Sequence, residues 1–307
     1  MEVSVIIVNY KTPQLCIDCI NSVFAKTIGL NFEIILVDND SQDNSLQIIK
    51  EEFGDKVILV DAKNNLGFGK ANNLGAEYAQ GEYLFLLNSD TILRNNAIKY
   101  LYDFIKNDST VGIVGGNLFD NDGNHAHSFK YNQFDLNSLK VVGFFKAMLH
   151  KLGGKMPDWE FNDTKKPVEL SGYITGADLM IKKSIFDEVG GFDKDFFMYF
   201  EESEMTYRVR QLGYKVYSVP SAEIIHLEGA STKGKSFSER RQRMFNKSAV
   251  IYFHKVYGEE YVKDCYKVMI SNCNKVAFRK FLQCDFDAMR KLNREKKILK
   301  EESRKYK

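Results

Sequence analysis

The sequence predicts an α/β protein with a mainly parallel sheet that helices cover on both faces. Two observations carry this prediction: strand-sized apolar runs alternate with segments of helical periodicity through the first half of the chain, and each run ends in polar residues. The 307 residues are 44% hydrophobic and 27% charged, which is ordinary for a globular protein and excludes disordered, collagen-like and disulfide-scaffold chains. At about 150 residues per domain, one large domain or two modest ones are expected.

The N-terminal part alternates strands and helices. The expected strands are residues 3–8, 33–37, 57–60 and 83–87, and the expected helices are residues 12–25, 41–53 and 69–79. Pro13 stands at an early helical position, where a missing N–H costs no hydrogen bond. In open α/β sheets ligands bind at the carboxyl ends of the strands, so the polar residues at these ends are the first candidates for a site.

The regular alternation breaks after an expected strand at residues 111–114. Residues 119–168 are polar and irregular, with one amphipathic segment at 139–152, and are interpreted as an insertion near the site. Regularity returns with a strand at 172–181 and a helix at 184–189, and a further apolar strand ends at His226. From about residue 237 the chain is helical and basic, and residues 290–307 are expected to be frayed or disordered.

Charge is distributed unevenly between the two parts of the chain. Residues 1–232 hold 22 Lys and Arg against 32 Asp and Glu, whereas residues 233–307 hold 21 against 9. A basic helical tail is typical of contact with an anionic surface such as lipid headgroups, although a solvated helical face is the alternative interpretation. The tail shows no nucleic-acid-binding motif, so nucleic acid is not an expected partner.

The sequence also bears on the compartment. No apolar run approaches the roughly 18 residues of a membrane span, and Met1 begins no secretory signal pattern. The five cysteines are an odd number without a secretion signal, which favours reduced thiols. We therefore expect a cytoplasmic protein.

Three polar stretches follow the predicted strands. Asn88-Ser89-Asp90 offers the oxygen ligands that Mg²⁺ and Mn²⁺ prefer, although a strand that ends in this way is also typical of a turn. The stretch from Asp38 to Ser41 suits a base or ribose, or the N-cap of the next helix. Residues 64–73 are rich in glycine and amides before a helix, which favours close backbone approach to an anion.

Two further positions are candidates for catalysis or metal binding. Glu201, Glu202 and Glu204 lie within four residues, and like-charge repulsion with burial would raise one pKa toward the range of a general base. The alternative is a surface ion-pair row with Arg208 at helical spacing. His226 is either a structural residue or a metal ligand, and a nearby carboxylate such as Asp90 would decide between them.

Taken together, these segments resemble family 2 of the inverting glycosyltransferases, in its rhamnosyltransferase-like branch, over about residues 3–231. The resemblance rests on seven motifs in family order: VIIVNY (5–10), LVDN (36–39), NLGFGKANNLG (65–75), LLNSD (86–90), GAxxM (176–180), GGFDxxFFxYxEE (190–202) and PxAxxxHxxGxS (220–231). It implies an A-type glycosyltransferase fold, with a nucleotide-binding half at about 1–116 and an acceptor-binding half at about 117–232 over one continuous sheet. A basic helical C-terminal region, residues 233–307, follows.

The resemblance also implies roles for single residues. Asp90 matches the metal-binding aspartate and His226 the histidine that completes the metal site in some relatives, while Asn88 stands where many members have a first Asp. Glu202 matches the catalytic base, with Glu201 as the fallback assignment. The expected nucleotide-binding residues are Asn9, Asp38, Asn39, Asn65, Gly67, Asn72 and Asn88.

The implied activity is metal-dependent transfer, with inversion, of a sugar from a nucleotide-diphosphate donor to a hydroxyl of a saccharide acceptor, in cell-surface polysaccharide synthesis. The branch indicates rhamnose as the sugar and Mg²⁺ or Mn²⁺ as the metal. A lipid-linked acceptor would place the enzyme peripherally at the inner membrane face, through its basic tail. The alternatives are a sugar-nucleotide nucleotidyltransferase, whose Gly-rich phosphate loop is missing near Asn9, and an inactive carbohydrate-binding descendant of the fold.

Overall fold

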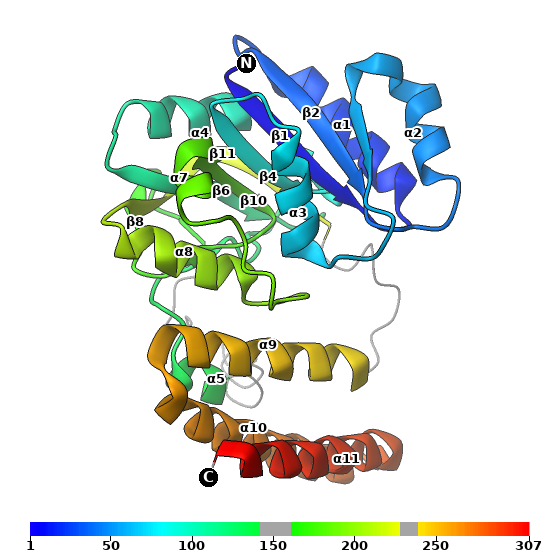
Figure 1. The fold of residues 1–307 in the computed structure, drawn as a ribbon, viewed down its shortest axis with the longest axis vertical. Coiled ribbons are helices and arrows are strands. Elements are labelled where there is room, and N and C mark those ends of the chain that lie inside the picture. Colours follow the sequence, from blue (N-terminus) through cyan, green and yellow to red (C-terminus); the bar gives the residue numbers. More distant parts are fainter. Residues whose placement is uncertain (142–160, 228–238, 307) are drawn as a thin grey trace.

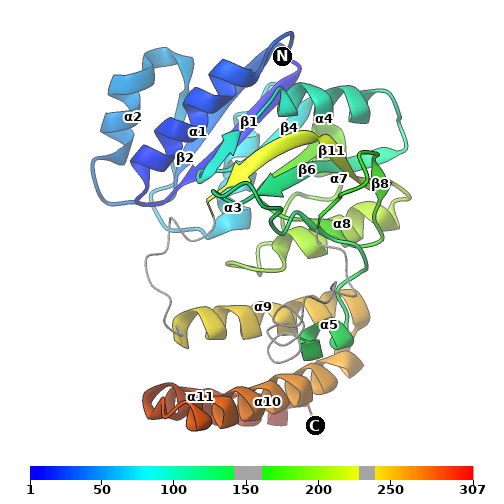
Figure 2. The ribbon, with the colours of Figure 1, turned by 180° about the vertical axis from the view of Figure 1, so that it is seen from behind.

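The computed structural model describes residues 1–141, 161–227 and 239–306, and its centre is one mixed sheet of nine strands (Figures 1 and 2). The strand order is β3-β2-β1-β4-β10-β6-β11-β5, with β8 paired to β11. The strands are β1 Val3–Asn9, β2 Phe32–Asp38, β3 Ile58–Asp61, β4 Tyr83–Asn88, β5 Thr91–Leu93, β6 Val111–Phe119, β8 Val168–Glu169, β10 Asp178–Lys182 and β11 Lys215–His226. The α/β fold class predicted from the sequence is confirmed.

Helices cover both faces of the sheet because the inner strands are apolar on both sides. Val5 and Ile7 of β1 belong to the core on the face of α1 Pro13–Lys26, α2 Ser45–Phe53 and α4 Ala97–Lys106. Ile6 belongs to the core on the opposite face, with α3 Phe68–Glu77, α7 Lys183–Glu188 and α8 Glu201–Gln211. Helix α4 has no counterpart among the sequence predictions.

Two of the elements predicted for the α/β part need correction. The helix predicted from residue 41 begins at Ser45, because the backbone N–H and hydroxyl of Ser41 both donate to Asp38 and hold a turn there. The strand predicted at 172–181 is two strands in different sheets: β9 Tyr173–Ile174 pairs with β7 Phe129–Lys130, and β10 joins the main sheet. At the break the Thr175 N–H donates to the Ser128 carbonyl at 3.1 Å rather than to the main sheet, and Gly172 lies so close to the Lys130 carbonyl that a Cβ would stand 1.9 Å from its oxygen, so residues 172–175 stay beside β7.

Strand β11 brings a distant segment to the carboxyl end of β4. It runs parallel to β6 and then pairs in antiparallel register with β5, so that His226 lies opposite Thr91, the residue after Asp90. The leucine after His226 donates its backbone N–H to the Asp90 carbonyl at 2.9 Å. Residues 90 and 226 are therefore neighbours although 136 positions separate them along the chain.

A helical layer lies below the α/β part in Figure 1. It consists of α9 Glu239–Tyr257, α10 Glu259–Leu282, α11 Phe286–Ser303 and a short 3₁₀ turn, Arg304–Tyr306, and it packs with α5 Leu136–Val141 of the insertion. The prediction of a frayed end at 290–307 is wrong for the described residues, because Leu292 and Leu299 are buried on α11. Most of the amphipathic segment predicted at 139–152 lies outside the described residues, as do Gly229, Ser231 and the boundary near 232.

Candidate active site

Asn9 and Asp38 form a buried polar corner at the carboxyl ends of β1 and β2. The two strands pair in parallel with Asn9 directly opposite Asp38, and the Asn9 amide donates to the Asp38 carboxylate at 2.6 Å. The Ser41 hydroxyl donates to the same carboxylate oxygen at 2.6 Å and accepts from Asn9 at 3.1 Å. These hydrogen bonds orient the Asp38 carboxylate at the sheet edge.

A second group of predicted residues forms the loop between β3 and α3, which we call the donor loop, residues 63–68. The Asn39 amide oxygen accepts the Leu66 N–H at 2.8 Å, and its amide group donates to Asn65 at 3.3 Å and to the Gly67 carbonyl at 3.4 Å. Asn39, Asn65 and Gly67 therefore lie together. Asn72 is buried on α3 and donates to its own helix at the Phe68 carbonyl, 3.0 Å away.

Gly67 joins the donor loop to the segment that precedes α8. Its φ is +81°, and a Cβ at this position would lie 2.1 Å from the Phe197 carbonyl oxygen. The next residue, Phe68, donates its N–H to that oxygen at 3.1 Å. Only glycine combines this backbone conformation with so close an approach.

The predicted metal residues form a pair. His226 Nε2 lies 3.3 Å from Asp90 Oδ1 and 3.5 Å from the Asn88 amide nitrogen. Asp90 is 8% exposed, so its carboxylate stands at the surface of the sheet edge without being freely solvated. A carboxylate therefore lies beside His226, as the metal-ligand interpretation of this histidine requires.

The pair Asp90 and His226 suits a hard divalent cation as part of a larger ligand set. Mg²⁺ is usually bound by one or two protein carboxylates together with phosphate oxygens and water. Among the described residues, no group of three or more His, Cys, Asp or Glu side chains is placed to hold a metal ion alone. The chemistry of this donor set fits a cation that a diphosphate completes.

Asp178 is a carboxylate of this region that the sequence reasoning missed. It is fully buried at the start of β10, accepts the Gly116 N–H at 2.6 Å, and is close enough to His226 for their charges to interact. Burial raises its pKa to about 7, against the opposing effects of the Gly116 N–H and His226. The position lies within the GAxxM motif, and only the antiparallel pairing of β10 with β4, which the sequence does not show, brings it here.

Glu201 and Glu202 begin α8, directly after two residues in left-handed backbone conformation, Tyr199 and Phe200, with φ of +73° and +70°. Consecutive positive φ values in bulky residues are strained and are maintained by surrounding packing. Here the Phe200 ring packs against Phe134, 4.9 Å between centroids. This packing fixes the direction in which the two carboxylates leave the backbone.

The two glutamates differ in their environments. Glu201 is 3% exposed, and burial followed by repulsion from Glu202 raises its pKa well above the usual value. Glu202 is partly exposed, and burial raises its pKa to about 6, while the charge of His127 lowers it. With a pKa of about 6, Glu202 is mostly a carboxylate at neutral pH, which is the form that can accept a proton, and the pKa of Glu201 is raised by its deeper burial.

His127, which comes from the insertion, is a second residue that sequence reasoning missed. Its influence on Glu202 arises from the tertiary fold, since β7 pairs with β9 and the Thr175 N–H donates to the Ser128 carbonyl at 3.1 Å. The only available signal was its place in a polar segment already interpreted as an insertion near the site.

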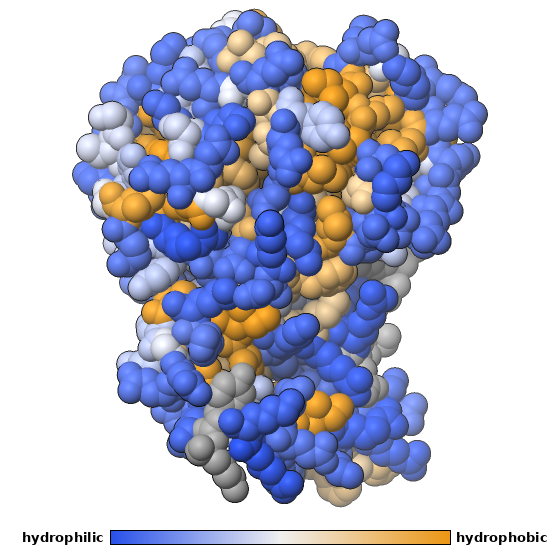
Figure 3. All heavy atoms as spheres, in the orientation of Figure 1, coloured by the Kyte–Doolittle hydropathy of each residue, from blue (hydrophilic) through white to orange (hydrophobic). Residues whose placement is uncertain are grey.

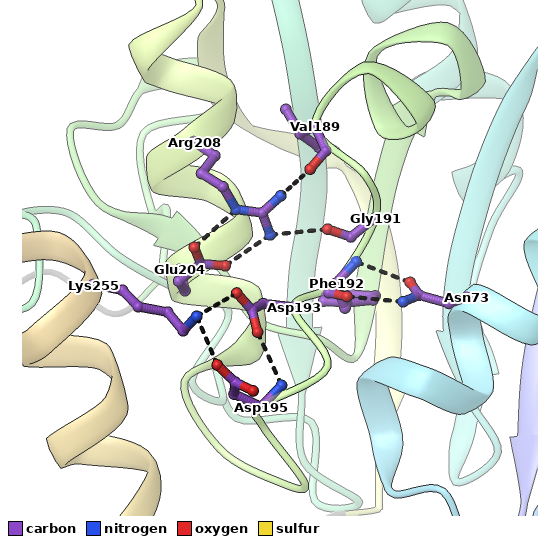
Figure 4. A network of polar contacts seen from close by, with 9 residues as sticks. All are labelled: Asn73, Val189, Gly191, Phe192, Asp193, Asp195, Glu204, Arg208 and Lys255. Atoms are coloured by element: carbon purple, nitrogen blue, oxygen red, sulfur yellow. Dashed lines mark hydrogen bonds and ion pairs between the residues drawn. The ribbon is translucent and has the colours of Figure 1, made fainter.

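The third glutamate of the cluster, Glu204, has a structural role (Figure 4). It forms a two-point ion pair with Arg208, with distances of 2.8 and 2.7 Å, and Arg208 also donates to the carbonyls of Val189 and Gly191. The ion pair expected from the sequence thus forms between Glu204 and Arg208, but it is not a surface pair, because Glu204 is buried, and Glu201 is not part of it.

The same network ties the segment before α8, residues 189–200, to two other parts of the molecule. The Asn73 side chain of α3 both donates to and accepts from the backbone of Phe192 at 2.8 Å. Lys255 of α9 reaches Asp193 at 2.7 Å and Asp195 at 2.8 Å. As Figure 4 shows, Asn73 of α3 and Lys255 of α9 both contact this segment, which we call the base loop.

Solved structures identify the class of fold. The chain superimposes over 87% of its length on GalNAc-T7 with UDP, GalNAc and Mn²⁺, with a TM-score of 0.61, 20% identity and 51% of that chain covered. It superimposes equally far on the mannosyltransferase PcManGT from Pyrobaculum calidifontis in complex with GDP-Man and Mn²⁺, with a TM-score of 0.56, 17% identity and 71% of that chain covered. The fold is therefore the A-type glycosyltransferase fold, with added C-terminal helices.

The family follows from the sequence comparison. A family model described as glycosyl transferase family 2 matches residues 4–190, and the chain belongs to this family. It is 29% identical over 191 residues to the glycosyltransferase GlyG of Streptococcus pneumoniae, covering 61% of this chain and 58% of that protein. It is 28% identical over 214 residues to the N-acetylglucosaminyl-diphospho-decaprenol L-rhamnosyltransferase of Mycobacterium tuberculosis, covering 65% of this chain and 67% of that protein.

Proposed function

We propose that the protein transfers a sugar from a nucleotide-diphosphate donor to a hydroxyl group of a saccharide acceptor, with inversion at the anomeric carbon. The observation that carries this proposal is Glu202: a partly exposed carboxylate with a pKa raised to about 6, fixed at the start of α8 beside the base loop that the donor loop contacts. Family membership and relatives named as glycosyltransferases support it.

In this proposal the roles divide between the two halves of the sheet. Asn9, Asp38 and Asn39 bind the nucleoside, and the donor loop with Asn65 and Gly67 approaches the diphosphate through its backbone. Asn72 supports that loop from α3, and Asn88 borders the metal pair. We further propose residues 1–232 as the catalytic unit and residues 233–307 as a helical addition that completes the acceptor side.

Asp90 and His226 would hold Mg²⁺ or Mn²⁺. When bound, such an ion supplies charge neutralisation on the leaving diphosphate. Solved neighbours contain Mn²⁺ together with a nucleotide or nucleotide sugar, which supports this choice. The chain's own part is to keep the Asp90 carboxylate oriented through His226 and Asn88.

Glu202 is proposed as the general base. Its carboxylate accepts the proton of the acceptor hydroxyl as that oxygen attacks the anomeric carbon from the face opposite the leaving group, which inverts the configuration. Glu201 is the more deeply buried of the two glutamates, and burial followed by repulsion from Glu202 raises its pKa, which makes it the poorer acceptor of this proton. The sequence left these two residues open, and their environments favour Glu202.

The finer identity of the substrates is also proposed. The mycobacterial relative is named for rhamnose transfer to a diphosphate-linked lipid saccharide, which supports a deoxyhexose donor and a polyprenyl-diphosphate-linked acceptor in cell-surface polysaccharide synthesis. A panel of nucleotide sugars tested with Mn²⁺ for thermal stabilisation of the native protein would identify the donor, since a ligand that binds only the folded state raises its apparent stability.

The deciding experiment compares Glu202→Gln with the matched control Glu169→Gln, an exposed glutamate on β8. General-base assistance increases a reaction rate by about 10² to 10⁴-fold, so the transfer rate of Glu202→Gln should fall by that factor. Donor binding, measured as thermal stabilisation by the nucleotide sugar, should be unchanged. The control should match the wild type. Full transfer by Glu202→Gln would contradict the assignment, and donor binding without any transfer by the wild type would indicate a carbohydrate-binding protein instead.

For the metal, chelator should abolish transfer and added Mn²⁺ should restore it in the wild type. Asp90→Asn should weaken Mn²⁺ binding measured by calorimetry in the presence of nucleoside diphosphate. Undiminished turnover in chelator would remove the metal from the scheme.

A further inference from the structure

The turn between α10 and α11 carries a concentrated group of exposed apolar side chains. Their exposed fractions are 65% for Phe278, 53% for Phe281, 66% for Leu282 and 47% for Phe286. The Phe281 and Phe286 rings lie 6.2 Å apart. We call these four residues the apolar tip. Other exposed large apolar side chains of the described residues are scattered along the chain, and scattered ones are normal for a soluble surface.

The apolar tip extends beyond the core that holds the C-terminal helices together. On α10 the last fully buried side chain is Cys273, and on α11 burial begins at Ala288. Between them the helices turn through residues 283–285, closed by the Asp285 side chain, which accepts the Ala288 N–H at 3.1 Å and pairs with Lys280 at 3.0 Å. The four apolar side chains therefore lie outside the buried core of the hairpin, which presents them at its turn.

Cations flank this tip along both helices. Residues 275–291 contain five Lys and Arg against two Asp, and Lys275, Arg279 and Arg290 are exposed. One of the two acidic residues, Asp285, is paired with Lys280. The face of the C-terminal helices visible in Figure 3 is predominantly hydrophilic.

We propose that the apolar tip inserts into the interface of an anionic lipid bilayer while the surrounding Lys and Arg bind the phosphate headgroups. Aromatic and Leu side chains flanked by cations are the composition that such interfacial insertion requires. A second copy of the chain is a poorer occupant, because two tips of this charge would repel each other. Among the described residues no helix is long and apolar enough to cross a membrane, so this contact is peripheral.

The docking goes beyond the proposed function and does not depend on it. Binding to vesicles is measured without donor or acceptor, so a failure here would leave the transfer reaction untouched, and an inactive enzyme could still bind. If both hold, the bilayer surface would present a lipid-linked acceptor to the enzyme.

Cys284 provides a direct probe, since it lies in the turn and is exposed, whereas the other four cysteines are buried. The full chain is labelled at Cys284 with an environment-sensitive fluorophore and mixed with phosphatidylglycerol-containing or pure phosphatidylcholine vesicles. We expect a blue shift with the anionic vesicles only, and quenching by spin-labelled lipid. The matched control carries the label at Ile28→Cys in a Cys284→Ser background; Ile28 is 70% exposed in the loop beside the N-terminus and should show no shift.

Substitutions then separate the apolar contribution to vesicle binding from the electrostatic contribution. Binding is measured by vesicle co-sedimentation. Phe281→Ser and Leu282→Ser should each weaken binding by about tenfold, which is the worth of burying such a side chain. Lys275→Gln and Arg279→Gln should each cost about fivefold on anionic vesicles. Lys247→Gln, an exposed lysine of α9, should change nothing. The serine variants remove exposed side chains only and should keep the wild-type melting temperature.

Three outcomes would overturn the proposal. One is an unchanged Cys284 label spectrum with anionic vesicles. Another is equal co-sedimentation of the wild type and the Phe281→Ser, Leu282→Ser double variant. The third is a spectral shift that needs no lipid and disappears on dilution, which would assign the apolar tip to self-association instead.

Discussion

Lys255 of α9 is held against Asp193 of the base loop, with 2.7 Å between its Nζ and the carboxylate Oδ2. The hydrogen bond to Asp193 raises the pKa of Lys255, and although burial opposes the ionisation of Asp193, the lysine keeps the pKa of that carboxyl below its usual value. Both groups are therefore charged across the neutral range. The C-terminal helices are thus joined to the segment that fixes Glu202.

From this contact we predict that Lys255→Met lowers kcat by roughly ten- to a hundredfold, because small displacements of a catalytic group are costly. The loss of folding stability should stay below about 1 kcal/mol, since the ion pair is partly exposed. Steady-state kinetics and thermal unfolding measure the two effects. Lys255→Arg keeps the charge and should retain most of the activity. Lys247→Met, on the same helix, should behave as the wild type. A wild-type kcat in Lys255→Met would exclude a positioning role for Lys255.

The pH dependence of transfer should report Glu202. Activity requires its carboxylate form, so kcat should fall as the pH drops through about 6. His127 lowers the pKa of Glu202 by its charge, and His127→Gln should therefore move the acid limb of the profile to higher pH. His125→Gln is the control, since that ring stacks on Phe161 and is exposed. An acid limb that does not move in His127→Gln would show that this histidine does not act on the base.

Gly67 tests the contact between the donor loop and the base loop. Gly67→Ala should destabilise the fold by about 1–3 kcal/mol and weaken donor binding, because the added methyl group would collide with the Phe197 carbonyl. Gly123→Ala separates conformational strain from collision, since Gly123 has a similar φ of +83° with nothing within 4 Å of a Cβ. Donor affinity should fall in Gly67→Ala alone, and an equal loss in both variants would refute the role of this contact.

The sequence predicts those site residues whose position depends only on local patterns, namely the residues at the ends of strands. Asn9, Asp38 and Asn88 follow apolar runs of strand length, and parallel pairing then brings strand ends to one edge of the sheet without further information. The match of these residues to family motifs suggested a role for each of them, but it gave no information on how they are arranged in space.

The part that the sequence does not predict depends on pairings between distant segments. Asp178 reaches the sheet edge only because β10 enters in antiparallel register, and Lys255 reaches the base loop only through packing of α9 on the α/β part. Helix α11 shows the same limit: its charged sequence indicates fraying, but Leu292 and Leu299 are buried against the neighbouring helices. Tertiary burial here outweighs local composition.

Glu201 should make folding stability depend on pH. The pKa of Glu201 is about 4.5 in the unfolded chain and is raised well above this value in the folded protein. In the pH range between these two pKa values, the folded state keeps a proton that the unfolded state has released. Stability contributed by this group is therefore present at low pH and lost as the pH rises. Glu201→Gln imitates the protonated form, and its melting temperature should equal that of the wild type below pH 4.5 and exceed it increasingly as the pH rises from 4.5 to the folded-state pKa. Each kcal/mol gained corresponds to about 2–4 °C in a protein of this size class. Glu52→Gln, an exposed control, should give a constant difference, and a Glu201→Gln difference that is also constant with pH would show that Glu201 is ionised in the folded state.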